Sequence, residues 1–134
     1  MGDRASIELR YPAEGEWRPK GGSVFIYLHW LAHETPVILA KALERGGKGH
    51  DDYDYFAAII MREIVRAAGI DDDMSMGVGP TYADGVKWVV DLKAQTIAPP
   101  DQSSPWDRQT SDTPLSYEDF LASVKNGKDY GYGL

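Results

Sequence analysis

The stretch Ser23–Thr35 constrains the fold of this chain more than any other. Its apolar residues Val24, Ile26, Leu28 and Trp30 alternate with Phe25, Tyr27 and His29. A strand with apolar side chains on both faces is typical of an interior position in a sheet. Thr35-Pro36 then predicts the start of a helix, because threonine can serve as N-cap and proline fits the first helical turn.

The remaining elements follow from hydrophobic spacing. Ile7 and Leu9 alternate with Glu8 and Arg10, which predicts a half-buried strand that pairs antiparallel with strand 23–30. The spacing of Phe56, Ile60 and Ile64 predicts a helix ending near Gly69. Further segments complete the series: a helix over 36–46, strands over 74–82 and 86–97, and a helix from Ser116.

The order β-β-α-α-β-β-α predicts an α+β fold, a two-layer sandwich with a mostly antiparallel sheet. We expect one domain over residues 1–125 and a flexible C-terminal tail over residues 126–134, which is rich in glycine and tyrosine.

Composition excludes several classes of function. The net charge is −7, which argues against binding a nucleic-acid backbone. Cysteine is absent, so thiolate chemistry and disulfides are excluded, in keeping with a cytoplasmic protein. We expect no signal peptide and no membrane segment, because no apolar run approaches the length of about 20 residues that spans a bilayer.

Polar and aromatic side chains cluster in the sequence where strand 23–30 ends. His29, Trp30, His33 and Glu34 stand close together there. The four-residue spacing of the histidines resembles a metal site only on a helix, and here the helix begins after them. We therefore expect no metal; the alternatives are ordinary structural histidines or histidines that contact a ligand.

Charged residues offer two further candidates. Arg62 and Arg66 lie one turn apart on the predicted helix and, with Arg4, could form an anion-binding ridge or simply a solvated face. Aspartates at 51, 52, 54 and 71–73 lack the spacing of a calcium loop, which favours helix capping and solvated loops.

Nucleophilic catalysis finds little support in the sequence. Ser75 and Thr81 stand outside any nucleophile elbow. The segment Gly77–Pro80 is too short and too interrupted by proline for a phosphate-binding loop. We therefore assign no catalytic residue and no cofactor.

The chain resembles a set of small, poorly characterised proteins from phage and actinobacterial genomes. The resemblance is carried by the segments MGDRA (1–5), YLHW (27–30), YFAAII (55–60), MGVG (76–79) and WVVDL (88–92). It covers most of residues 1–125 and brings no established activity. It implies a phage accessory role, such as host takeover or the blocking of a defence system.

Three classes of function remain. The first is a non-enzymatic protein that binds a small anionic or nucleotide-like ligand, with contacts from the residues Arg4, His29, Trp30, His33, Arg62 and Arg66. The second is an inhibitor that docks on a host protein through its acidic surface and exposed aromatic side chains. The third is a small hydrolase or nuclease with a histidine as general base.

Self-association is a separate hypothesis. Trp106 is hydrophobic for a loop, and the tyrosines of the tail are hydrophobic for a terminus. Side chains of this kind are typical of contacts between copies, so we expect a homo-oligomer.

Overall fold

A computed structural model of the 134-residue chain describes residues 4–16, 19–46, 52–72, 74–82, 85–100 and 113–130. The strands are β1 (Arg4–Tyr11), β2 (Gly22–His29), β3 (Met76–Gly79), β4 (Val86–Asp91), β5 (Thr96–Ala98) and β6 (Leu115–Ser116). The helices are a 3₁₀ turn η1 (Ala32–Glu34), α1 (Thr35–Gly46), α2 (Tyr53–Ala68) and α3 (Tyr117–Lys125).

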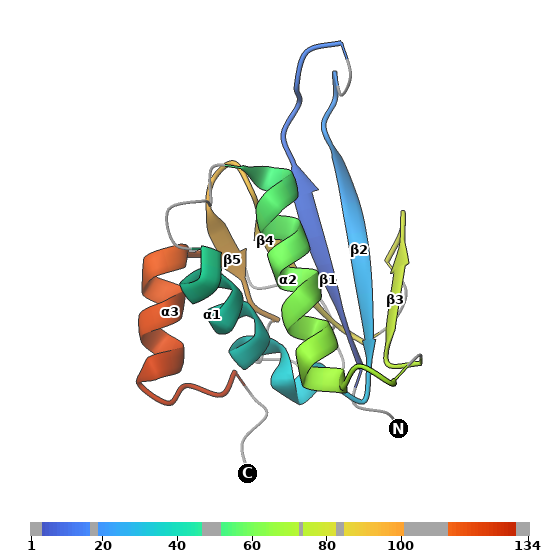
Figure 1. Cartoon of the computed structure of the whole chain (residues 1–134). Coiled ribbons are helices and arrows are strands. Elements are labelled where there is room, and N and C mark those ends of the chain that lie inside the picture. Colours follow the sequence, from blue (N-terminus) through green and yellow to red (C-terminus); the bar gives the residue numbers. More distant parts are fainter. Residues whose placement is uncertain are drawn as a thin grey trace.

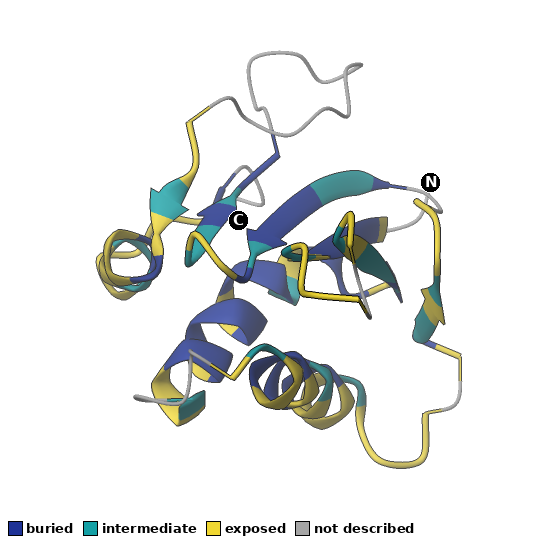
Figure 2. Cartoon of the chain, turned by 90° about the horizontal axis from the view of Figure 1, so that it is seen from above, coloured by how far each residue is buried: buried dark blue, intermediate teal, exposed yellow. Residues whose placement is uncertain are grey.

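The strands form one six-stranded sheet in the order β3-β2-β1-β4-β5-β6 (Figure 1). Every neighbouring pair is antiparallel except β1 and β4, which are parallel. Figure 2 shows α1 and α2 on one side of the sheet. The α+β class, the two layers and the mostly antiparallel sheet are therefore confirmed.

The core lies between the sheet and the helices. Ile7 and Leu9 of β1, with Ile26 and Leu28 of β2, are fully buried against apolar side chains of α1 and α2. We call this side of the sheet the helix face. Alternate strand residues point to opposite sides of a sheet, so Glu8, Tyr27 and His29 lie on the other side, the polar face.

Helices α2 and α3 begin, and α2 ends, at the residues that the sequence predicts. The Asp52 carboxylate accepts a hydrogen bond from the Tyr55 amide at 3.0 Å, and Ser116 accepts one from the Asp119 amide at 3.1 Å. These contacts satisfy amides that the helix itself leaves unpaired. Gly69 ends α2 with φ 96°, a backbone conformation that favours glycine.

Three details of the predicted elements are wrong. The short strand β6 was not expected, so four strands rather than two separate α2 from α3. The strand over 86–97 divides into β4 and β5, because the Asp91 carboxylate accepts a hydrogen bond from the Ala94 amide and Gln95 turns the chain with φ 57°. Thr35 is the first residue of α1 rather than a cap outside it, because η1 runs directly into the helix.

The last described residues pack on the core. The tail was expected to leave the domain at residue 126, yet Tyr130 is only 4% exposed. Its ring stacks on Phe120 at 5.5 Å between centroids and meets Trp88 edge-on at the same distance. Aromatic burial therefore extends the core to residue 130, and residues 131–134 lie outside the described part of the chain.

Candidate functional site

The register of β1 and β2 brings two of the predicted site residues together. Arg4 lies directly opposite His29 in the antiparallel pair. Directly opposed residues share one side of a sheet, so both side chains belong to the polar face. The His29 amide also donates to the Ser75 carbonyl at 3.0 Å, which fixes the end of β2 against the chain entering β3.

His29 is held by two aromatic neighbours. Its Nδ1 lies 3.0 Å from the Tyr27 hydroxyl, two residues earlier on the same face of β2. Its ring meets the Trp30 indole edge-on, with 4.7 Å between centroids. A half-buried imidazole is thus oriented by a tyrosine and a tryptophan.

Trp30 does not continue the alternation of β2. Alternation would place it beside Leu28 on the helix face, yet it is 59% exposed. Its φ of 69° lies in the left-handed region, which is uncommon for bulky residues. The cause is local: the chain must leave β2 and enter η1 within two residues, and the left-handed residue makes that reversal while its indole turns to solvent.

The other neighbour of Arg4 is the start of β4. Ala5 pairs with Val86, and the preceding Gly85 has φ 82°. A Cβ added at Gly85 would lie 2.7 Å from the Ala5 nitrogen, so only glycine fits this approach. The exposed Tyr82 donates its hydroxyl hydrogen to the Gly85 carbonyl. Arg4 therefore lies between His29 on one side and the turn carrying Tyr82 on the other.

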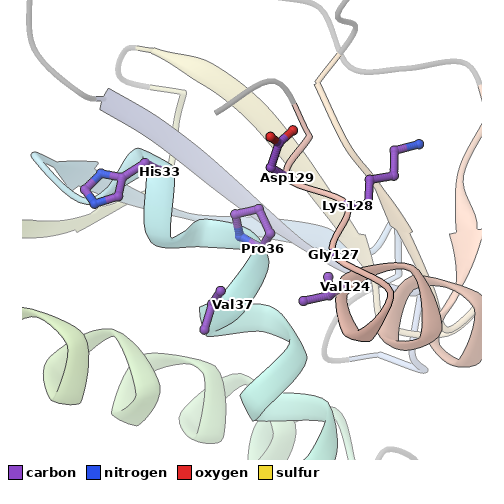
Figure 3. Close-up of a pocket in the computed structure, with 7 residues that line it drawn as sticks. All are labelled: His33, Pro36, Val37, Val124, Gly127, Lys128 and Asp129. Carbon is purple, nitrogen blue, oxygen red and sulfur yellow. The ribbon is translucent and has the colours of Figure 1, made fainter. Parts of the chain in front are cut away.

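His33 belongs to a different surface. It lies in η1, with Nε2 3.5 Å from the Glu34 carboxylate. It lines a cavity of about 410 Å³ between the start of α1 and the end of α3, whose lining residues are His33, Pro36, Val37, Val124, Gly127, Lys128 and Asp129. Figure 3 shows His33, Asp129 and Lys128 on one side of the group of lining residues, Pro36 between them, and Val37 and Val124 on the other side.

The charges around this cavity do not favour an anion. The Asp129 carboxylate lies at its rim, and the Lys128 ammonium sits 4.9 Å from the centre of the Tyr130 ring. In Figure 3 the Lys128 side chain points away from His33. This cavity is mainly apolar, and His29 and Trp30 are not among the described residues that line it.

Arg62 and Arg66 are exposed residues of α2, in the helix layer. The Arg66 guanidinium lies 2.6 Å from Glu63, a buried carboxylate that also pairs with Arg45 of α1. The Arg45–Glu63 pair ties α1 to α2, and Arg66 adds a second cation to the same buried carboxylate. Of the six predicted residues, the structure brings together Arg4, His29 and Trp30, and it places His33, Arg62 and Arg66 elsewhere.

Two of the aspartates, Asp52 and Asp72, accept hydrogen bonds from nearby backbone amides. Asp72 accepts hydrogen bonds from the Ser75 hydroxyl at 2.6 Å and from the Met74 and Ser75 amides. The Ser75 hydroxyl, followed by these amides, holds the pKa of Asp72 below its ordinary value. Asp51 and Asp73 lie outside the described residues, and within the described ranges no group of three or more metal-ligating side chains occurs.

Tyr27, Tyr82 and Gly85 complete this site and were not predicted as members of it. The alternation of β2 was the signal for Tyr27, because it shares a face with His29. For Tyr82 and Gly85 no local signal exists, since their place beside Arg4 depends on the pairing of β1 with a strand far along the chain.

Comparisons of the chain with protein-family models, with curated proteins and with solved structures gave no match. The class of protein therefore rests on the fold and on the Arg4, His29 and Trp30 site.

Among the described helices, none has the length and apolar character needed to cross a bilayer.

Proposed function

We propose that this is a non-enzymatic binding protein that holds a small anionic, nucleotide-like ligand at Arg4, His29 and Trp30. The observation that carries the proposal is the register that sets Arg4 opposite His29. A guanidinium can form two parallel hydrogen bonds with a phosphate or carboxylate. The exposed indole of Trp30 offers an apolar surface for a base, and the His29 ring meets this indole edge-on.

The backbone of Trp30 supports the same proposal. A bulky residue in the left-handed region costs about 1–2 kcal/mol relative to its preferred conformation. Such strain is often found where a side chain must be held for function. Here it keeps a large apolar ring in water, where the ring contributes little to the stability of the fold.

The resemblance to phage and actinobacterial proteins suggests the biological setting. A phage accessory protein of this kind would act by holding a signalling molecule away from its receptor in the host cytoplasm. Sequestration requires affinity rather than turnover, which fits a site built from a cation and aromatic rings.

Thermal unfolding with a panel of mono-, di- and cyclic nucleotides tests the proposal. A ligand present at a hundred times its dissociation constant stabilises the folded state by about 2.7 kcal/mol. For a domain of this size that corresponds to a rise in Tm of roughly 10 °C. No shift with any member of the panel would contradict a nucleotide-like ligand.

Three variants locate the site once a ligand is found. Trp30→Asn removes the indole but keeps a residue that tolerates the left-handed conformation, so the fold is retained. We expect this variant and Arg4→Gln each to weaken binding by about tenfold or more. Arg62→Gln, the control for a lost positive charge, should bind as the parent protein does. Equal losses in Arg4→Gln and Arg62→Gln would contradict the proposed site.

A further inference from the structure

The strand β3 leaves its outer edge unpaired within the described part of the sheet. It is the last strand of the order and pairs with β2 alone. Hydrogen-bonded and non-hydrogen-bonded positions alternate in an antiparallel pair. Because Ser75 is bonded to His29, positions 77 and 79 also face β2, and the amides and carbonyls of Met76 and Val78 face outward.

Apolar side chains gather along this same edge. Val78 is 54% exposed, and the chain leading into β3 carries Ile70 and Met74 at 87% and 84% exposed. Val65 of α2 is also exposed. A cavity of about 100 Å³ lies between α2 and the start of β3, lined by Ile64, Val65, Ala68, Asp72, Ser75 and Met76. The edge therefore continues into an apolar hollow.

The two edge strands of the sheet, β3 and β6, differ in how readily they can pair with another chain. At the other end, β6 is only two residues long and follows Pro114, which has no amide hydrogen to offer. Short edge strands and prolines prevent pairing with other chains. β3 is longer, with the four uncharged residues MGVG, and Pro80 directly after it limits pairing to this segment. Figure 1 shows β3 beyond α2 rather than beneath it.

We propose that β3 pairs with β3 of a second copy of this chain, across a two-fold axis, which joins the two sheets into one. Met76 of one copy lies opposite Val78 of the other, so the outward amides and carbonyls bond each other. Both residues lie on the helix face, as their partners Leu28 and Ile26 do, and they form apolar cross-strand pairs. The two copies of Gly77 meet at the axis, where strands approach most closely.

The charges near the edge favour a second copy over an unrelated partner. The exposed Arg62 stands on α2 and the exposed Asp71 on the loop before β3, whereas Arg66 and Asp72 already bind Glu63 and Ser75. A two-fold axis repeats a surface on both subunits, so a patch must be complementary to itself. A patch that carries both signs around an apolar centre meets this condition despite the net charge of −7.

Sedimentation equilibrium of the full chain over a range of concentrations tests the proposal. The parent protein should show twice the chain mass of 14.9 kDa. Val78→Pro removes the outward amide without touching the β2 ladder. Because the symmetric contact loses two hydrogen bonds, dimerisation should weaken by about a hundredfold.

Val78→Lys is the second variant, because it keeps the backbone but places charge in the apolar contact. Val37→Lys is its matched control, since Val37 is a similarly exposed valine on α1. We expect a monomer from Val78→Lys and a dimer from Val37→Lys. A monomeric parent protein would overturn the proposal, as would a dimer that survives both changes at Val78, which would place self-association elsewhere.

Discussion

Replacing Glu8 with glutamine tests the polar network on the polar face of the sheet. Glu8 is 6% exposed and accepts hydrogen bonds from Ser23 at 2.6 Å and from Arg10 at 3.1 Å. The Lys87 ammonium lies 3.1 Å from its other oxygen. In glutamine one of these acceptors becomes a donor, so an Arg10 or Lys87 donor faces another donor.

The size of the effect follows from burial. Hydrogen bonds to a charged group contribute about 1.5–3 kcal/mol each. Arg10 is exposed and Lys87 is half-buried, so both can regain water and limit the loss. We expect Glu8→Gln to lower the free energy of unfolding by about 2 kcal/mol at pH 7. In urea this moves the unfolding midpoint down by roughly 1 M.

The pH dependence gives a second readout. Burial raises the pKa of Glu8, but hydrogen bonds from Arg10, Ser23 and Lys87 outweigh it, and the pKa lies below its ordinary value of 4.5. A lowered pKa means that the stabilisation is complete above pH 4.5 and is lost as the pH falls through the folded-state pKa. Glutamine does not titrate, so the difference between the two proteins should shrink in acid.

Urea unfolding of both proteins at pH 7 and pH 3 makes the comparison. Glu44→Gln is the control, because Glu44 is exposed and lies 4.0 Å from Lys125, and it should change stability by less than about 0.5 kcal/mol. A difference for Glu8→Gln that is as large at pH 3 as at pH 7 would refute the reasoning.

Three further changes test the packing and the turns by thermal unfolding. Gly85→Ala should cost about 3 kcal/mol, because the added Cβ meets the β1 backbone, whereas Gly69→Ala has open space and should cost about 1 kcal/mol; equal losses would contradict the close approach. Tyr130→Ala should cost about 3 kcal/mol, and an unchanged Tm would show that the ring does not belong to the core. Asp52→Ala should cost about 1 kcal/mol through loss of the N-cap, with circular dichroism to follow the helix; no loss would argue against the cap.

Much of the fold was predictable because it depends on local patterns. The spacing of Phe56, Ile60 and Ile64 located α2, and the alternation of Ile7 with Leu9 located β1. The same apolar spacing also predicted which side of each element faces the core. The division of strand 86–97 was missed, because Asp91 makes its turn through a side-chain hydrogen bond with no glycine or proline to mark it.

The parts that failed depend on contacts between distant segments. Nothing near residues 76–79 predicts that Gly77 and Gly79 belong to an edge strand beside β2. That pairing depends on where the chain runs after the end of α2. The candidate site shows the same limit. His29 and Trp30 were found from their place after a strand, but their distance from Arg4 depends on the hairpin register, which the sequence between 12 and 21 does not specify. Trp106 lies outside the described residues, so the self-association expected from it stays a prediction.

The place of β1 in the sheet has a consequence for how the protein is made. β1 is interior, yet one of its neighbours, β4, begins at residue 86. During synthesis, the backbone amides and carbonyls on one side of β1 have no strand partner until residues 86–91 have been made. Pairing across such a separation is slow to form and open to mispairing in the interval. Yield in a heterologous host should therefore depend on chaperone supply and growth temperature more than the stability of the finished fold would suggest.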